Sequence, residues 1–168
     1  MTNPASWDDQ APIHRKNTKR SSCAKVAPYV TPASAFAATR RSSITLLTTG
    51  SEIAEARRFM AAFVDGLALA ADAVLCVSEV ATNAVLHSNS GVAGGRFAVS
   101  AECYSDGRLR IEVEDQGGGW IERAKTEGQH LGLMIVNQLS SAWGIEGDGG
   151  KHRTVWFELS PLPAIRAI

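Results

Sequence analysis

Residues 79–87, with the sequence EVATNAVLH, hold the pattern that decides how this chain folds. Glu79, Asn83 and His87 follow one another at intervals of four, so in an α-helix they form one polar stripe, while the small and aliphatic residues between them face the other way. The pattern predicts a helix over residues 73–87 that packs its apolar face on a sheet and points Glu79 and Asn83 at whatever lies above it.

Two features beside this predicted helix bear on its role. Asp72 stands directly before it and can cap its first turn. No Lys or Arg occurs between Asp72 and Arg96, whereas the exposed face of a surface helix usually carries several charges. A functional site therefore explains the polar stripe better than contact with water alone, and an ordinary solvated face is the alternative.

Two glycine-rich segments follow the helix along the chain. Residues 115–119 (DQGGG) come directly after a predicted strand, and a carboxylate followed by glycines suits a ligand that approaches the backbone and donates a hydrogen bond to the acid. Residues 128–133 (GQHLGL) open another helical pattern, and the unpaired N–H groups of a helix start attract phosphate. For each segment, a tight turn without a ligand is the alternative.

Apolar periodicity and turn signals predict the remaining elements. Ser51 can cap a helix, and the Asp-Gly pair at residues 106–107 is a strong hairpin signal. The sum is an α+β two-layer sandwich in which a mixed, mostly antiparallel sheet carries helices on one face. The expected elements are, in chain order, a strand at 43–48, helices at 53–67 and 73–87, strands at 96–104 and 108–114, a helix at 131–141, and strands at 143–146 and 154–159.

Length and composition predict one domain with a tail at each end. The chain has 168 residues, of which 45% are hydrophobic, and this is enough for one core. Residues 1–41 hold seven Lys or Arg against two Asp and show neither a helical nor a strand period, so we expect a disordered basic tail there. The domain is assigned to residues 42–162, and residues 163–168 form a short C-terminal tail.

The same sequence disfavours several classes of function. No apolar run approaches the roughly 20 residues that span a bilayer, so no membrane anchor is expected. The excess of basic charge is sparse and confined to the tail, which does not indicate direct nucleic-acid binding. Cys23, Cys76 and Cys103 are scattered, with no histidine spaced to complete a metal site, and such a set fits a reducing cytoplasm.

The three motifs, in this order, resemble the N, G1 and G2 boxes of the GHKL superfamily, whose members share the Bergerat ATP-binding fold. The boxes correspond to residues 79–87, 114–119 (EDQGGG) and 128–133, and each alone is a weak signal. Together with the short chain and a closing KHRTVWFEL at residues 151–159, they resemble the branch of bacterial anti-sigma-factor serine/threonine kinases. The resemblance spans residues 43–160.

This resemblance implies a binding site for ATP and Mg²⁺. By it, Glu79 is the catalytic base that orients or deprotonates an acceptor hydroxyl, and Asn83 is the metal ligand that holds Mg²⁺ against the phosphates. Asp115 accepts a hydrogen bond from the amino group of adenine, and Thr154 on the closing strand assists it. Because guanine carries a carbonyl where adenine carries that amino group, ATP is expected to be preferred to GTP.

Further nucleotide contacts are implied within the two glycine-rich segments. Gly117 and Gly119 would let the first segment cross the base. The second segment would form a lid over the phosphates, flanked by Gly128, Leu131, Gly132 and Leu133. The lid departs from the family pattern at His130, which takes a position usually held by glycine and would stiffen the backbone. His130 would then either contact phosphate or slow phosphotransfer.

The function implied by the resemblance is that of an ATP-dependent regulator in the cytoplasm. Such a protein holds a sigma factor inactive and phosphorylates an antagonist protein on serine or threonine, and it can act as a homodimer. The alternative is a module of the same fold in which ATP orders the lid for partner binding without phosphotransfer. A histidine-kinase catalytic domain is disfavoured, because the upstream segment offers only His14 as phosphoacceptor and lacks the heptads of a dimerisation helix pair.

Overall fold

The computed structural model describes residues 37–118, 131–147 and 150–161 of the chain. None of its described helices combines the length and the hydropathy needed to cross a membrane. The elements are, in chain order, β1 (Ala38–Leu47), α1 (Glu52–Phe63), α2 (Ala70–His87), the short 3-10 helix η1 (Asn89–Gly91), β2 (Arg96–Tyr104), β3 (Leu109–Asp115), α3 (Leu131–Leu139), β4 (Ala142–Glu146) and β5 (Arg153–Leu159).

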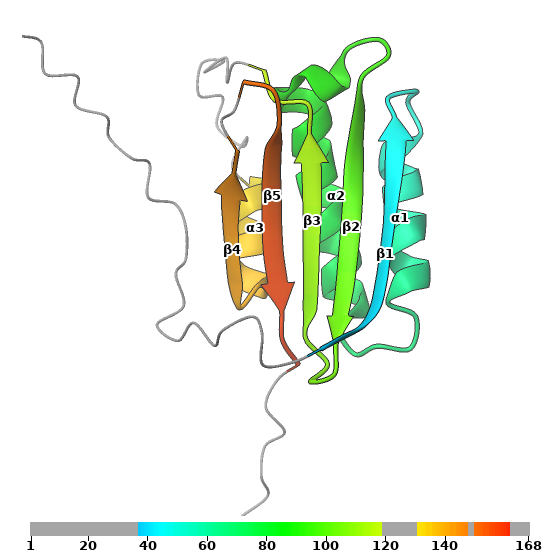
Figure 1. Cartoon of the computed structure of the whole chain (residues 1–168), viewed down its shortest axis with the longest axis vertical. Coiled ribbons are helices and arrows are strands. Elements are labelled where there is room, and N and C mark those ends of the chain that lie inside the picture. The colour runs from blue at the N-terminus through cyan, green and yellow to red at the C-terminus, as the bar shows by residue number, and fades with distance from the viewer. Residues whose placement is uncertain (1–36, 119–130, 148–149, 162–168) are drawn as a thin grey trace, which may run out of the picture.

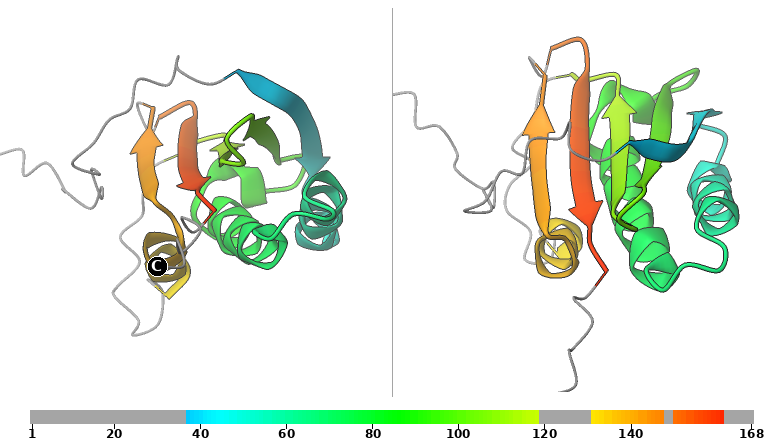
Figure 2. Two further views of the ribbon diagram at one scale, coloured as in Figure 1. Left: turned by 90° about the horizontal axis from the view of Figure 1, so that it is seen from below. Right: turned by 60° about the horizontal axis from the view of Figure 1, so that its bottom comes forward.

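The five strands form one sheet in the order β1-β2-β3-β5-β4, and each pairing is antiparallel. The three α-helices lie on one face of this sheet (Figure 1), as the view along the strands in Figure 2 also shows. The expected α+β two-layer sandwich is confirmed, but the expectation of a mixed sheet was wrong for the described strands. Two helices separate β1 from β2, so the chain enters β2 from the opposite end, whereas a single crossover helix would have made the pair parallel.

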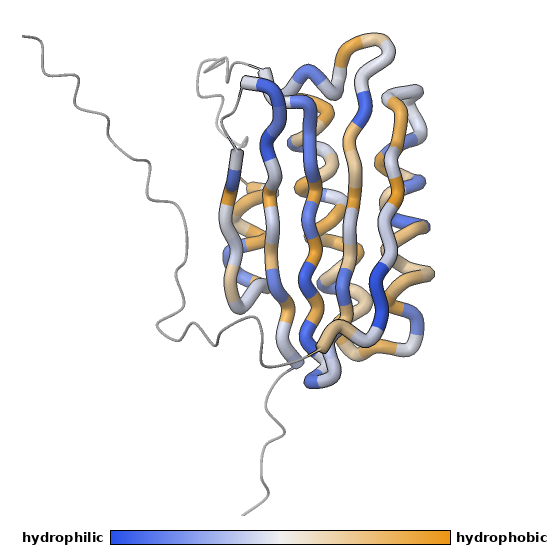
Figure 3. The backbone as a smooth tube through the Cα atoms, in the orientation of Figure 1, coloured by the Kyte–Doolittle hydropathy of each residue, from blue (hydrophilic) through white to orange (hydrophobic). Residues whose placement is uncertain are grey.

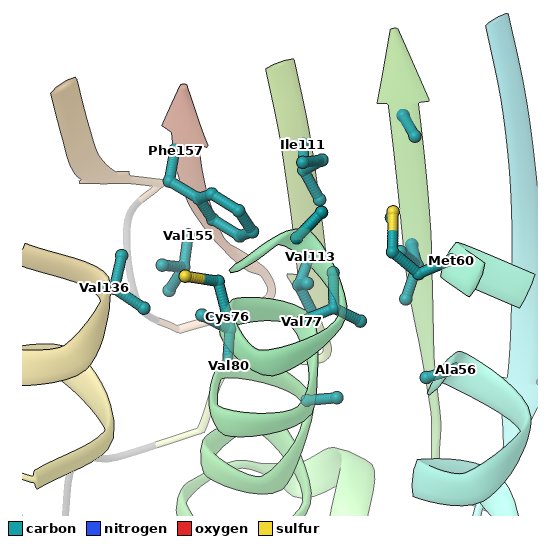
Figure 4. Packing of buried hydrophobic residues seen from close by; sticks show 14 of the residues in the cluster. Ala56, Met60, Cys76, Val77, Val80, Ile111, Val113, Val136, Val155 and Phe157 are labelled. Carbon is teal, nitrogen blue, oxygen red and sulfur yellow. The ribbon is translucent and has the colours of Figure 1, made fainter. Parts of the chain in front are cut away.

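The hydrophobic core lies between the sheet and the helices. Alternate residues of β3 and β5 are buried, and in Figure 3 apolar and polar stretches alternate along β3 in the same way. Full burial of each large apolar side chain contributes roughly 1.5–3 kcal/mol, so this packing fixes α2 across the middle strands. Figure 4 shows the side chains that meet there, among them Cys76, Val77 and Val80 of α2, Ile111 and Val113 of β3, and Val155 and Phe157 of β5.

Strand β1 begins at Ala38, five residues before the strand expected at residue 43. Residues 38–41 were assigned to the tail, but the structure pairs them with the end of β2. The Thr39 hydroxyl donates to the Cys103 carbonyl oxygen at 3.0 Å, and Arg41 forms an ion pair with Glu102 at 2.9 Å. Because the side chains of this stretch are largely polar and exposed, the sequence gives no hydrophobic signal for it.

The ends of the first two helices also differ from the expected ones. Helix α1 ends at Phe63, and Gly66 beyond it adopts a φ of 76°, a conformation that ordinary residues rarely take. Helix α2 begins at Ala70, so Asp72 lies within its first turn and does not cap it. Leu69 takes the N-cap position and offers no side-chain hydrogen bond, which is why the sequence does not mark this helix start.

Candidate functional site

The structure brings the predicted catalytic stripe of α2 against the start of α3. Glu79 and Asn83 are both half-buried on α2, and the facing residue of α3 is the buried Gly132. A methyl group placed on Gly132 would lie 2.9 Å from Glu79 Oε2 and 3.5 Å from Asn83 Nδ2. Glycine therefore allows the α3 backbone to approach these two side chains closely, and the first and third predicted motifs meet at this point.

Cys76 lies one turn before Glu79 on the same helix, but it takes no part in this polar stripe. Its side chain is fully buried. Burial raises the pKa of the Cys76 thiol to about 12, and the negative charges of Asp72 and Glu79 act in the same direction. The thiol therefore stays protonated at neutral pH, which excludes it as a nucleophile for the chemistry of the stripe.

Asp115 ends β3 and begins the second predicted motif. It is buried, with only 3% of its surface exposed. Its Oδ1 accepts a hydrogen bond from the backbone N–H of Gly117 at 2.7 Å, which bends the chain sharply after the strand. Gly117 and Gly118 follow with φ values of 60° and 103°, the left-handed region that favours glycine.

The loop after β3 is fastened to the end of α2 by two residues that the sequence analysis did not single out. The Asn89 N–H donates to the Gly117 carbonyl oxygen at 2.7 Å, and a methyl group on Gly118 would lie 2.7 Å from the Asn89 side chain. The fully buried Ser90 accepts from the Gln116 N–H at 2.9 Å and donates to a backbone carbonyl of β2. These contacts hold the second motif beside the C-terminus of the helix that carries the first.

Arg153 is the other functional residue that the sequence analysis missed. It lies directly opposite Asp115 in the register of β3 and β5, and its Nε and Nη2 donate to Asp115 Oδ2 at 2.9 and 2.7 Å. Its Nη2 also lies 3.5 Å from the carbonyl oxygen of His87, where the polar stripe of α2 ends. The strand period would have revealed it, because Arg153 stands two residues before the buried Val155 and shares its face.

The structure does not bring Thr154 to Asp115. Thr154 is paired with Glu114 in the register of β3 and β5, and it points to the face of the sheet away from the helices. The assignment of Thr154 as the partner of Asp115 was therefore wrong by one residue, because side chains alternate between the two faces of a strand. The neighbour of Asp115 on the helical side is Arg153.

The predicted lid lies mostly outside the described residues. Gly119, Gly128 and His130 are not described, so their expected roles stay predictions. Leu131, the first residue of α3, is 60% exposed, and Leu133 packs partly against the core. Among the described lid positions, Gly132 approaches Glu79 and Asn83 closely.

Cavities near the ends of the helices and strands can be compared with the predicted site. One of about 550 Å³ lies between α1 and α2, and one of about 280 Å³ lies at the ends of β2 and β3 beside Asp115, Gln116 and Lys151. Neither is lined by Glu79 or Asn83. Within the described ranges, no group of three or more His, Cys, Asp or Glu residues is arranged to hold a metal ion.

Comparison with known families identifies the class of this protein. The fold and the order of the motifs define an ATP-binding domain of the kinase-like ATPase type. Residues 47–158, two thirds of the chain, match the model of the histidine kinase-like ATPase domain. The chain therefore belongs to the family of histidine kinase-like ATPase domains, and this membership assigns ATP binding to it.

Two individual proteins resemble parts of the chain. Blue-light-activated histidine kinase 2 of Erythrobacter litoralis (strain HTCC2594) is 40% identical over 73 residues, which make up 43% of this chain and 21% of that protein. The match thus spans about a fifth of the length of this relative. The crystal structure of the RsbU and RsbW domains of Rv1364c from Mycobacterium tuberculosis aligns with a TM-score of 0.57 at 24% identity, over 73% of this chain and 32% of that one. This second likeness supports the fold.

Proposed function

We propose that this protein is an anti-sigma regulatory kinase. It binds Mg·ATP, transfers the γ-phosphate to a serine or threonine of an antagonist protein, and holds a sigma factor inactive. The observation that carries the proposal is the meeting of Glu79 and Asn83 with Gly132, because it presents a carboxylate and an amide together at the junction of α2 and α3. The activity would take place in the cytoplasm, where ATP and sigma factors are found.

The residues at this junction fit a magnesium-bound triphosphate. Asn83 offers a neutral amide oxygen, a hard ligand that adds no repulsion toward phosphate. Mg²⁺ keeps several waters and takes only one or two protein oxygens beside those of the phosphates, so a single amide is a sufficient contribution from the protein. When bound, Mg²⁺ neutralises charge on the phosphates. Gly132 keeps side-chain atoms out of the space beside Glu79 and Asn83.

Glu79 would act on the acceptor hydroxyl. Phosphoryl transfer requires positioning of the attacking oxygen and removal of its proton, and it requires little covalent work from the protein. Glu79 Oε2 lies at the α2–α3 junction and its side chain is half-buried, so it can accept that proton while remaining accessible to an incoming side chain. Asn83, one turn further along α2, would hold the Mg²⁺-bound phosphates beside Glu79.

The proposed partners are supported by the similar crystal structure. That structure contains an RsbW domain beside an RsbU domain in one chain, and the fold of the present protein resembles it. The closing segment at residues 151–159 resembles that of the anti-sigma branch of the superfamily. The histidine kinase that matches residues of this chain favours instead a histidine acceptor. We propose serine or threonine, because the order of the three motifs and the closing segment resemble the anti-sigma branch.

The proposed activity is tested by replacing the two residues of the stripe. Asn83→Ala should weaken Mg·ATP binding at least about tenfold, because the metal loses its protein ligand, whereas Glu79→Gln should keep ATP binding and lower single-turnover phosphotransfer by about 10²–10⁴-fold. Binding is measured by calorimetry, and transfer by labelled γ-phosphate incorporated into a candidate antagonist. Asp72→Asn, a charge change on the same helix away from the junction, is the control and should alter neither property.

Two results would contradict this assignment. If Asn83→Ala binds Mg·ATP as tightly as wild type, Asn83 is not the metal ligand. If Glu79→Gln transfers phosphate at the wild-type rate, Glu79 is not the catalytic base. The bond type of the product provides a separate check, because phosphoserine and phosphothreonine survive acid whereas phosphohistidine does not. An acid-labile product would overturn the proposed acceptor class and leave ATP binding intact.

A non-catalytic, ATP-dependent binding module is the second candidate. It is favoured by His130, which takes a position usually held by glycine in the second glycine-rich segment. In such a module, ATP would bind and stabilise the partner-binding form without phosphotransfer. Nucleotide binding together with the absence of transfer to any antagonist, by the intact chain, would select this candidate.

A further inference from the structure

We infer that Arg153 determines how strongly the site distinguishes one purine from another, because it occupies the Oδ2 atom of Asp115. The inference rests on the proposed function, in which Asp115 reads adenine. It names the residue that sets base selectivity and predicts that the natural protein is a poor discriminator between ATP and GTP.

The hydrogen bonds of Asp115 are largely used within the protein. An ionised carboxylate offers about four lone-pair sites. Both sites of Asp115 Oδ2 are engaged by Arg153, whose Nε and Nη2 donate to it at 2.9 and 2.7 Å. One site of Oδ1 is taken by the Gly117 N–H at 2.7 Å. The oxygen Oδ2 therefore has no lone pair left for the amino group of a base.

The position of Arg153 makes this pairing persistent. Asp115 and Arg153 are direct neighbours across β3 and β5, and their side chains are only 2% and 11% exposed. The guanidinium also lies beside the carbonyl oxygen of His87, the last residue of α2, where a helix favours positive charge. Separating the pair would leave a buried charge without its partner, which is strongly unfavourable. Arg153 is thus held in place by the sheet and by the helix end together.

A purine amino group competes poorly with such a partner. The charge of the guanidinium adds Coulomb attraction to its two hydrogen bonds with Asp115, and a neutral amino group lacks this attraction, so adenine gains little by displacing the guanidinium. Strong discrimination arises when a ligand that lacks a donor leaves a buried acceptor unpaired. Here the charge of Asp115 is already paired with Arg153 and only one site, on Oδ1, stays free, so a purine without the amino group leaves no unpaired charge behind and loses little affinity.

The test measures the affinity of the full-length protein for three ligands, with Mg²⁺ present. They are ATP, GTP, and purine riboside 5′-triphosphate, which lacks the amino group altogether. The wild-type protein should bind all three within about threefold of one another. Arg153→Thr should bind ATP at least about tenfold more tightly than either of the other ligands, because it releases Asp115 Oδ2. Arg153→Gln, which keeps a neutral donor there, should show a smaller preference for ATP in the same direction.

Two features of the design separate selectivity from folding. Threonine suits a β-strand and removes the donor, whereas glutamine keeps a neutral amide donor beside Asp115. Comparing the two variants separates the effect of the positive charge from that of the donor. Arg110→Thr, which removes an ion-paired arginine from the other face of the sheet, is the matched control and should keep the wild-type ratios. A purely structural role for Arg153 would lower thermal stability and leave the ratios of the three affinities unchanged.

The outcomes are distinguishable. A wild-type protein that already prefers ATP tenfold over the desamino analogue overturns the inference, and this comparison needs no variant. Unchanged ratios in both folded variants of Arg153 overturn it as well, while nucleotide binding itself leaves the proposed function standing. If no form of the protein binds any of the three ligands, the proposed function fails, and the inference that rests on it fails too.

Discussion

At the scale of single residues, Gly132 is the position where one added methyl group would reach the proposed catalytic carboxylate. In Gly132→Ala, the new carbon would lie 2.9 Å from Glu79 Oε2 and 3.3 Å from Glu79 Cβ. The terminal oxygen can swing away, so the fold should tolerate the change, but the carboxylate would leave its place beside Asn83. We expect phosphotransfer to fall by about 10- to 100-fold, since small misplacements of a reacting group are costly.

Single-turnover transfer and thermal unfolding, measured on the same preparation, check this prediction. Gln138→Ala, an exposed change on the same helix, is the control and should leave both quantities at wild-type values. A Gly132→Ala variant with normal transfer would show that the contact with Glu79 has no bearing on the chemistry. A variant that unfolds at a much lower temperature would show that the Glu79 side chain cannot move aside.

Individual residues also show how much of the candidate site can be predicted from the sequence. The four-residue spacing of Glu79 and Asn83 places them on one helical face, and the glycine-rich helix start near residue 132 indicates a close backbone approach. Helical spacing and glycine-rich motifs do not identify the partner of Asp115, because Arg153 lies 38 residues away along the chain and meets Asp115 through strand register. Motif matching selected Thr154, whereas the two-residue period of β5 puts Arg153 on the inner face.

At the scale of elements, the start of α1 is held by Glu52. Ser51 occupies the N-cap position, as predicted, but its hydroxyl donates to Glu55 Oε1 at 2.7 Å and caps no backbone group. The Glu52 carboxylate instead accepts from the backbone N–H groups of Thr49 and Gly50 at 2.9 and 2.6 Å. Burial raises the pKa of Glu52, but hydrogen bonds from the backbone N–H groups around it outweigh burial and lower the pKa below 4.5.

This arrangement predicts a pH-dependent contribution to stability. A carboxyl group whose pKa is lowered by folding stabilises the folded state above its unfolded pKa, and the contribution is lost as the pH falls through the folded pKa. Glu52→Gln should therefore lower the free energy of unfolding by about 1–2 kcal/mol at pH 7, and the difference from wild type should shrink as the pH falls below about 4.5. Urea unfolding across this pH range measures it, and Glu55→Gln serves as the control. A difference that stays constant down to acidic pH would rule out the ionised cap.

The strands show which elements composition and period can predict. Strands β2 and β3 follow from apolar alternation and from the Asp-Gly turn, where Gly107 adopts a φ of 82° and the Arg108 N–H donates to Asp106 Oδ1 at 3.0 Å. The early part of β1 could not be predicted, because it is an edge segment held by polar side chains against the end of β2. Its stability comes from contacts distant in sequence, which a local pattern does not contain.

At the scale of the whole molecule, the boundary of the domain can be tested by shortening the chain. Removal of residues 1–36 leaves β1 intact, whereas removal of residues 1–41 deletes the contacts of Thr39 and Arg41 with β2 and that of the Arg40 guanidinium, which lies 4.6 Å from the Phe63 ring centroid. These contacts contribute about 1–2 kcal/mol together, so the shorter chain should melt roughly 5 °C below the longer one.

Thermal unfolding followed by circular dichroism measures this difference. The chain that starts at residue 37 should melt within about 2 °C of the full-length protein, since every described strand is complete in it. Equal melting temperatures for the two shortened chains would show that residues 38–41 add nothing to the sheet. In that case the boundary at residue 42 would be adequate for the folded domain.

The order of the strands also governs when the protein can fold during its synthesis. The hairpin of β2 and β3 needs only a four-residue turn, but β3, the middle strand, acquires its second neighbour β5 only when residues 153–159 have left the ribosome. Until then the edge of β3 that pairs with β5 has no hydrogen-bonding partner. A nascent chain halted before β5 should therefore attract chaperones. The last strand to be translated thus completes the centre of the sheet, and it also delivers Arg153 to Asp115.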